Sequence, residues 1–430
     1  MASSLTTAER NATRDVTKYV LLLLQLAAAL VVIYVFKLEN RTFGEMSALV
    51  VGGFAAHYWL PFRWKKPCFV MFSMAAAFAL LHHLAAAMLI GSGLVLYAIL
   101  HLPAPYAMRA GLVAIIGAGC LAARNHQFDD PGLSEIMSSF WPVFGGIFMF
   151  RMMIYVYDLR QEKSAGTLLD YLAYFFILPN YYFLLFPVID YQTMRSTYYS
   201  AEFHKQAQEG VRWIARGLSQ LLIYRLIYHL RPNPSPDDVT SLGTLVLTMV
   251  LTYLLYLRLS GQYHVIIGMM HLFGFNLPET HRRFLFAESL TDFWRRINIY
   301  WKDFMVKMFY YPVFFRLRAY GDMGATAAAT CVVFGLTWFL HAYQFYWLSG
   351  KFLLALHDLL FWAILGILVL LNVLYEMRPK PKTAARPKAR WFVRPVKIAA
   401  TFSLITVLWS MWNSRSLAEW VDMLTYWRVG

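Results

Sequence analysis

Long stretches without a formal charge constrain the fold of this chain more than any other feature. The longest, Cys68–Met108, has 41 residues with no Asp, Glu, Lys or Arg. A membrane helix needs about 20 apolar residues, so this stretch predicts two crossings with a break around Gly91–Gly93 or at His82-His83. The whole chain is 59% hydrophobic and 15% charged, against about 45–50% and about 25% in soluble domains. An ordinary water-soluble enzyme is excluded, because a soluble fold has too little interior for so much apolar surface.

Further apolar runs continue along the chain and favour helices over the alternating strands of a membrane barrel. They predict an all-α polytopic membrane protein of about 10–12 helices. These runs are Tyr19–Phe36, Met46–Phe62, Ala110–Ala123, Ile136–Phe150, Tyr171–Ile189, Val239–Leu257, Leu259–Pro278, Met323–Gly350, Leu359–Tyr375 and Ile398–Ser414.

The net charge of +15 is interpreted as the Lys and Arg bias of cytoplasmic loops and not as a sign of nucleic-acid binding. Arg378–Lys397 holds eight Lys and Arg residues. We predict that this loop is cytoplasmic and that it contacts anionic lipid headgroups. The expected location is the cell inner (plasma) membrane, with several passes.

Two regions differ from plain spans. Leu285–Arg318 places charged side chains on one helical face and aromatic side chains on the other, which predicts an interfacial or re-entrant helix. His341 lies within a charge-free run of 28 residues, Met323–Gly350. An ionisable group at such a depth marks either a functional cavity or a hydrogen bond between helices, and position alone leaves both open.

Residues Ser260–Trp301 resemble the signature stretch of the membrane-bound O-acyltransferase (MBOAT) family. The bacterial branch of that family includes alginate O-acetyltransferases and the protein that transfers D-alanine towards teichoic acid. The matching residues are Ser260, Gly261, Gly268, Leu272-Phe273-Gly274-Phe275, Leu277-Pro278-Glu279 and Asp292-Phe293-Trp294-Arg295-Arg296. Downstream, Gly335, Leu336, Trp338 and His341 are similar to a second family element, and Phe175–Met194 is similar to a proline-containing re-entrant stretch.

The resemblance implies an MBOAT-like fold with short re-entrant helices around a central tunnel. It divides the chain into N-terminal transmembrane helices at 1–165, a catalytic core at 166–350 and C-terminal transmembrane helices at 351–430, with the basic cytoplasmic loop at 378–397. The implied reaction moves an acyl group, short and acetyl-like, from a thioester to a hydroxyl of an envelope glycan or lipid. The donor is acyl-CoA or an acylated carrier protein, membrane lipid surrounds the chain, and an envelope-side transferase is an implied partner. No tightly bound cofactor or metal is expected.

His341 is expected to be the general base, and Asn298 a donor to the oxyanion of the tetrahedral intermediate. Trp294, Arg295, Arg296 and His264 are expected to bind substrate, the two arginines through a phosphate or carboxylate of the donor. The list of expected site residues is therefore His341, Asn298, Trp294, Arg295, Arg296 and His264.

Two of these positions depart from the bacterial pattern. Asn298 stands where that branch has histidine, although asparagine is familiar from the sterol and diacylglycerol branch. His264 stands where an acidic residue is usual. The competing hypothesis is a non-catalytic MBOAT-like transporter or membrane scaffold, because intramembrane histidines also occur in transporters. The sequence weakens it, since no paired repeat halves are visible.

Overall fold

The protein is all-helical. Its structure, a computed structural model, describes residues 15–125, 130–161, 166–185, 187–230, 239–352, 354–378 and 392–428. These residues form helices and their connections without a strand; the one extended pairing is an isolated bridge between Tyr198 and Phe275. Of the predicted basic loop 378–397, residues 379–391 lie outside the described part, as does Phe186 in the proline-containing stretch.

Eight helical stretches in the described part are long and apolar enough to cross a membrane. The chain is therefore a multi-pass helical membrane protein, as its charge-free runs predict. The stretches are Val16–Val35, His83–Leu100, Tyr106–Arg124, Pro131–Arg160, Leu242–Leu272, Asp322–Ser349, Leu356–Glu376 and Val393–Asn413.

The chain divides into two compact units, each built from three segments. The first unit comprises residues 1–219, 261–278 and 344–351, and the second comprises 220–260, 279–343 and 352–430. The division into 1–165, 166–350 and 351–430 stays a prediction.

The first unit contains the following helices: α2 (Val16–Val35), α3 (Arg41–Trp59), α4 (Phe62–Leu80), α5 (His83–Leu100), α6 (Tyr106–Arg124), α7 (Pro131–Val143), α8 (Met149–Arg160), α9 (Leu168–Phe175), α10 (Tyr191–Ser196), and the parts of α11 (Phe203–Leu230), α13 (Leu257–Leu272) and α17 (Asp322–Ser349) that its segments cover.

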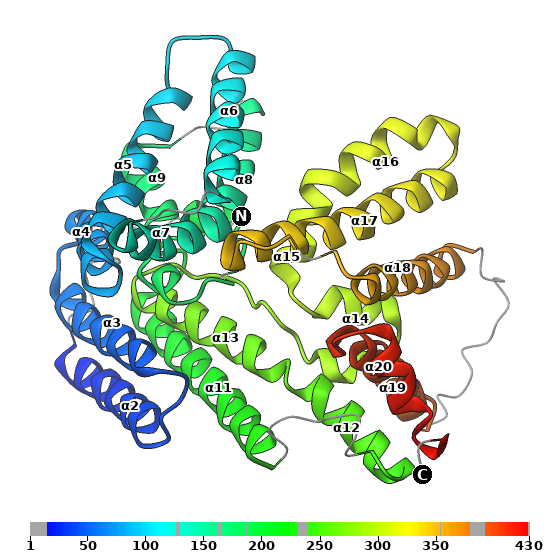
Figure 1. Cartoon of the computed structure of the whole chain (residues 1–430). Helices are drawn as coiled ribbons and strands as arrows, with labels where there is room; N and C mark the ends of the chain where they lie inside the picture. The colour runs from blue at the N-terminus through cyan, green and yellow to red at the C-terminus, as the bar shows by residue number, and fades with distance from the viewer. Residues whose placement is uncertain are drawn as a thin grey trace, which may run out of the picture. The chain divides into compact units, whose positions relative to one another are not determined.

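Successive helices pack on one another at the start of the first unit, α2 on α3, α3 on α4 and α4 on α5 (Figure 1). The predicted break in the longest charge-free stretch falls at His82-His83, while Gly91–Gly93 continue inside α5. His82 precedes α5 as its N-cap, and its Nδ1 accepts a hydrogen bond from the Leu84 amide at 3.3 Å. A capped start satisfies an amide that the helix itself leaves unpaired.

Gly261 and Gly268 bring α13 close to α11. A Cβ atom added at Gly268 would lie 2.5 Å from the Gly210 carbonyl oxygen, and one added at Gly217 would lie 2.5 Å from the Gly261 carbonyl oxygen. The two glycines are seven residues apart on each helix, which places them on one helix face. Gly261 and Gly268 are thus explained by close backbone packing.

Gly274, in the Leu-Phe-Gly-Phe motif, has a second structural reason. Its φ angle of +94° lies in the region that favours glycine, and an added Cβ would lie 1.9 Å from the Tyr199 ring. The Tyr199 amide donates to the Gly274 carbonyl at 2.6 Å. Neither the conformation nor the close contact tolerates a side chain.

The second unit is also helical, and its C-terminal helices α18 and α19 lie side by side (Figure 1). α19 packs on α12 as well, and α14 packs on α18. Its helices are the remaining parts of α11, α13 and α17, together with α12 (Leu242–Leu254), α14 (Leu290–Arg296), α15 (Ile299–Met305), α16 (Tyr311–Leu317), α18 (Leu356–Glu376), α19 (Val393–Asn413) and α20 (Leu417–Leu424).

The region Leu285–Arg318, expected as one amphipathic helix, is several short helices. The main break separates α14 from α15 at Ile297 and Asn298. Asn298 has φ 37° and ψ 60°, a left-handed conformation that no α-helix can pass through. Asparagine adopts it more readily than other non-glycine residues, so the break is encoded at this position.

Candidate functional site

His341 is held on α17 in one defined tautomer. Its Nδ1 lies 2.8 Å from the carbonyl oxygen of Thr337, one helical turn earlier. A carbonyl oxygen only accepts, so Nδ1 carries the proton and the neutral ring has its lone pair on Nε2. Nε2 forms no hydrogen bond with any described residue. Among the described residues, the fold therefore uses only one of the two ring nitrogens.

Three indole rings surround the His341 imidazole. The ring centroids of Trp301 and Trp362 are 4.9 and 4.8 Å away, and that of Trp412 is 6.5 Å away. They come from α15, α18 and α19, far apart in the sequence. These rings restrict both the orientation of the imidazole and the access of water to it.

Asn298 begins α15 on the chain segment that carries Trp301. Its Oδ1 accepts a hydrogen bond from the Trp301 amide at 3.4 Å, which caps the helix. Backbone hydrogen bonds on both sides of Asn298 join this segment to residues 280–282. The Ile299 amide donates to the Thr280 carbonyl at 2.7 Å, and the Arg282 amide donates to the Arg296 carbonyl at 3.0 Å. The side-chain NH₂ group forms no hydrogen bond with a described residue.

Asn298 and His341 therefore converge on one residue, Trp301. Asn298 contacts its backbone amide, and His341 contacts its ring. The structure brings the two residues expected to be catalytic to the same neighbour within one compact unit.

The expected substrate-binding residues of α14 have partners within the second unit. Arg296 Nε lies 2.7 Å from Asp292 Oδ1, and the other Asp292 oxygen accepts from the Glu288 amide at 3.0 Å. Arg295 is 63% exposed, and its Nη2 lies 4.0 Å from a Glu376 carboxylate oxygen. Arg295 is exposed and loosely paired, so its guanidinium is accessible. The Arg296 guanidinium instead pairs with Asp292 in the first turn of α14.

Trp294 and His264 have different surroundings. Trp294 packs on Phe334 of α17, with ring centroids 4.7 Å apart. His264 lies in the first unit, is fully buried, and stacks on Trp213 with centroids 5.2 Å apart and planes within 18°. The structure thus places Trp294 in the unit of His341 and gives His264 the surroundings of a core residue.

Asp358 and Trp412 also belong to the site, although neither is among the residues expected from the sequence. The Trp412 indole nitrogen donates to Asp358 Oδ1 at 2.6 Å, and the Trp412 ring stacks on Phe361 with centroids 4.6 Å apart. The available signal was an acidic residue at the start of a span and a Trp-Ser-Met-Trp sequence near the end of another. Neither pattern indicates its neighbours without the fold.

No group of three or more His, Cys, Asp or Glu side chains in the described ranges is placed to hold a metal ion. The fold and this site define a helical, multi-pass membrane protein with a partly buried histidine that contacts tryptophan rings. In comparisons with known proteins, no family model and no curated protein matches the chain.

Proposed function

We propose that the protein is a membrane O-acyltransferase, which moves an acyl group from a thioester to a hydroxyl with His341 as general base. The observation that carries the proposal is the His341 tautomer, with Nδ1 donating to Thr337 and the lone pair of Nε2 free of partners in the described part of the chain. A base must present such a nitrogen to the proton that it removes.

In the proposed reaction, each bond that forms is matched by one that breaks, and the proton returns to the leaving thiolate. The acceptor hydroxyl loses its proton to His341 Nε2 as its oxygen attacks the thioester carbonyl carbon. The oxyanion that forms accepts a hydrogen bond from the Asn298 NH₂ group. The carbon–sulfur bond then breaks, and the thiolate takes the proton back from the imidazolium, which restores the neutral base.

The proposed contacts with the acyl donor are made by residues at the end of α14, where Arg295 is exposed. Arg295 is proposed to bind a phosphate or carboxylate of the donor, acyl-CoA or an acylated carrier protein, because its guanidinium is exposed and loosely paired. Arg296 supports this segment through Asp292, and Trp294 packs it against α17. The proposed acyl group is short and acetyl-like, the proposed acceptor is an envelope glycan or lipid, and the proposed location is the inner membrane.

The decisive experiment measures thiol release from acetyl-CoA by the full chain in liposomes, with and without an added glycan acceptor, and the mass of that acceptor. We expect acceptor-dependent thiol release from the wild type and release that is lower by about 10²–10⁴ from His341→Ala. His101→Ala is the matched control: the Nδ1 atom of His101 also contacts the carbonyl four residues earlier, at 2.9 Å from Tyr97, but on the exposed end of α5.

The runner-up, a transporter or scaffold of the same fold, predicts a different outcome. Neither acetyl-CoA nor a longer acyl thioester would release thiol with any acceptor, while His341→Ala would leave the cellular role of the protein unchanged. Acceptor-dependent release that survives His341→Ala would contradict the proposed base.

A further inference from the structure

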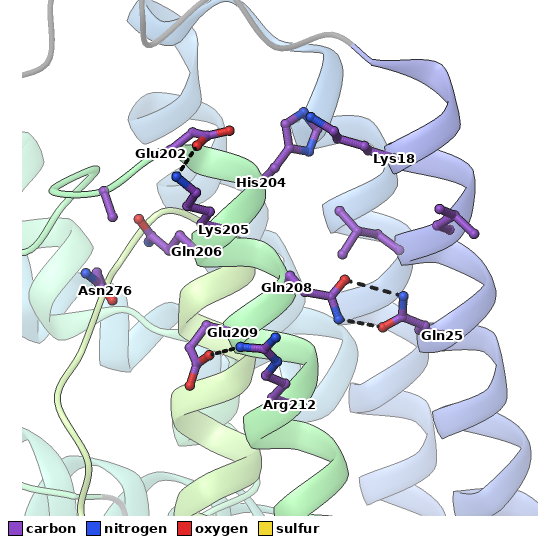
Figure 2. A pocket seen from close by; sticks show the side chains of 13 residues that line it. Lys18, Gln25, Glu202, His204, Lys205, Gln206, Gln208, Glu209, Arg212 and Asn276 are labelled. Carbon is purple, nitrogen blue, oxygen red and sulfur yellow. Dashed lines mark hydrogen bonds and ion pairs between the residues drawn. The ribbon is translucent and has the colours of Figure 1, made fainter.

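A pocket of about 620 Å³, lined largely by charged and amide residues, lies in the first unit, whereas the candidate site belongs to the second. The first turns of α2, the first turns of α11 and the segment before α11 form its walls, and Asn276 completes the lining. Figure 2 shows charged and amide side chains of α11 facing the pocket beside α2. The proposed acyl transfer makes no use of it.

The pocket lies at one end of a membrane-spanning helix. The start of α2 is joined to the end of α3, because the Tyr58 hydroxyl donates to the Asp15 carbonyl at 2.9 Å and the Tyr19 and Tyr58 rings have centroids 4.7 Å apart. Trp59 joins this aromatic group at 5.1 Å from Tyr19. Such rings mark the headgroup level of a bilayer, and the basic run Arg63–Lys66 that follows marks the cytoplasmic side.

The outer face of α2 next to the pocket is apolar and uncovered. Val20, Leu21 and Leu24 are 45%, 51% and 62% exposed, and Leu21 also lines the pocket. Within a membrane span, this face meets acyl chains. A ligand in the pocket would therefore continue directly into the hydrocarbon layer.

Charges of both signs alternate along the rim. Glu202 pairs with Lys205 and Glu209 pairs with Arg212, each at 3.0 Å (Figure 2). Lys18 on α2 also lines the pocket and lies 3.7 Å from the Asp15 carboxylate. The rim supplies three cations and two carboxylates. It therefore suits a ligand with a negative and a positive group close together better than a purely anionic one.

Polar groups continue below the rim. Gln25 and Gln208 donate to one another at 3.4 and 2.7 Å, which pairs the Gln25 amide on the α2 span with the Gln208 amide on α11. Gln206 is 2% exposed, and its Oε1 has no donor among the described residues. A buried acceptor of this kind costs free energy unless a ligand supplies an N–H or O–H group.

From this arrangement we propose that the pocket binds the headgroup of a phospholipid that carries a primary ammonium, as in phosphatidylethanolamine. The phosphate lies between Lys18 and Lys205, and the ammonium lies against Glu209 and Gln206, whose acceptor it satisfies. The acyl chains follow the apolar face of α2. A choline headgroup fits less well because its quaternary nitrogen has no N–H to donate.

Native mass spectrometry of the full chain tests the proposal. The detergent-purified protein is incubated with equimolar dioleoyl phosphatidylethanolamine, phosphatidylcholine and phosphatidylglycerol, and the retained lipid is counted. We expect one phosphatidylethanolamine per chain, retained about tenfold over the other two, which is the ratio that one charge-assisted hydrogen bond supplies.

Two variants and one control locate the binding. The double variant Lys18→Gln/Lys205→Gln and the single variant Glu209→Gln should each lower retention about tenfold, through the phosphate and the ammonium respectively. Arg41→Gln removes a comparable exposed ion pair with Glu45, at the other end of α2 and α3, and should leave retention unchanged. A thermal unfolding scan confirms that each variant is folded.

The source of the headgroup is tested with glycerophosphoethanolamine, which has no acyl chains. Failure of a hundredfold excess to displace the lipid supports a lipid site, and displacement at equal concentration overturns it in favour of a soluble ligand. Equal retention of the three lipids by the wild type also overturns the proposal, as does retention that none of the pocket variants changes.

Discussion

The indole ring of Trp301 stands nearly edge-on to the imidazole of His341, with ring centroids 4.9 Å apart and planes at 70°. The same tryptophan donates its backbone amide to Asn298. One residue thus connects the proposed base to the proposed oxyanion donor. Because the ring is almost completely buried, it fixes the imidazole from one side, and Trp362 contacts the imidazole as a second neighbour.

His341→Ala should lower acyl transfer by about 10²–10⁴, the usual contribution of a general base. The fold should persist, because the substitution removes one hydrogen bond to Thr337 and no ion pair. Single-turnover thiol release and a thermal unfolding scan measure the two effects separately. A collapse of the melting temperature that accompanies the loss of activity would show that His341 is a packing residue.

Substitutions of Asn298 should distinguish its role as a helix cap from its proposed role in catalysis. Asn298→Asp keeps an oxygen for the Trp301 amide and tolerates the left-handed backbone, but it removes the NH₂ donor. We expect near-normal stability with activity lower by about 10²–10³, the effect of one missing oxyanion donor. Asn298→His, which introduces the residue found at this place in the bacterial acyltransferases that the sequence resembles, supplies an N–H donor and should keep part of the activity. Full activity in Asn298→Asp would limit the residue to its capping role.

Trp412 and Asp358 should act as positioning residues for the wall around His341. Trp412→Phe keeps an aromatic ring but removes the N–H that donates to Asp358. We expect kcat to fall about tenfold with little change in KM, since the loss of a hydrogen bond to a charged group corresponds to about 1.5–3 kcal/mol. Asp358→Asn keeps an acceptor oxygen and should retain most of the activity. Steady-state kinetics of the two variants, Trp412→Phe and Asp358→Asn, measure this difference. An equal loss of activity in both variants would point to general unfolding.

Gly268→Ala should destabilise the first unit, because the new methyl group meets the Gly210 carbonyl oxygen at 2.5 Å. Overpacking of this kind costs about 1–3 kcal/mol. Gly335 is the control: it also lies in a helix, but no heavy atom lies within 4 Å of an added Cβ. Gly335→Ala should be neutral or stabilising by up to about 1 kcal/mol. Thermal unfolding of the two variants compares the positions directly.

Asp170 should make stability depend on pH. Burial raises the pKa of Asp170, but hydrogen bonds from Lys66 and Thr167 outweigh it and hold the pKa below its ordinary value. Lys66 Nζ lies 2.7 Å from one carboxylate oxygen. A lowered pKa means that the stabilisation is complete above the unfolded-state pKa, about 3.9, and is lost as the pH falls through the folded-state pKa.

Asp170→Asn should therefore lower the melting temperature at pH 7, and the difference from the wild type should shrink below about pH 4. Glu45→Gln is the control, since its exposed pair with Arg41 is worth at most about 1 kcal/mol. A difference that stays constant down to pH 3 would assign the effect to packing and not to the ion pairs.

The sequence by itself determined the helical, multi-pass class. Charge-free runs too long for a soluble helix have one stable solution in a bilayer, in which each backbone amide is bonded within its own helix. It also predicted a break in the longest stretch, and of the two positions that it left open, Gly91–Gly93 and His82-His83, the structure uses the second. The interruption at Asn298 was not predicted, although asparagine is the residue type that a left-handed helix start favours.

Tertiary structure alone decided what surrounds the candidate residues. Trp362 and Trp412 approach His341 from α18 and α19, and the spacing of residues along a chain does not encode which helices become neighbours. The tertiary structure also distinguished the motif glycines: Gly268 touches another backbone, whereas Gly335 faces open space. The physical reason is the same in both cases. Periodicity fixes the face on which a side chain lies, but only packing decides what lies against that face.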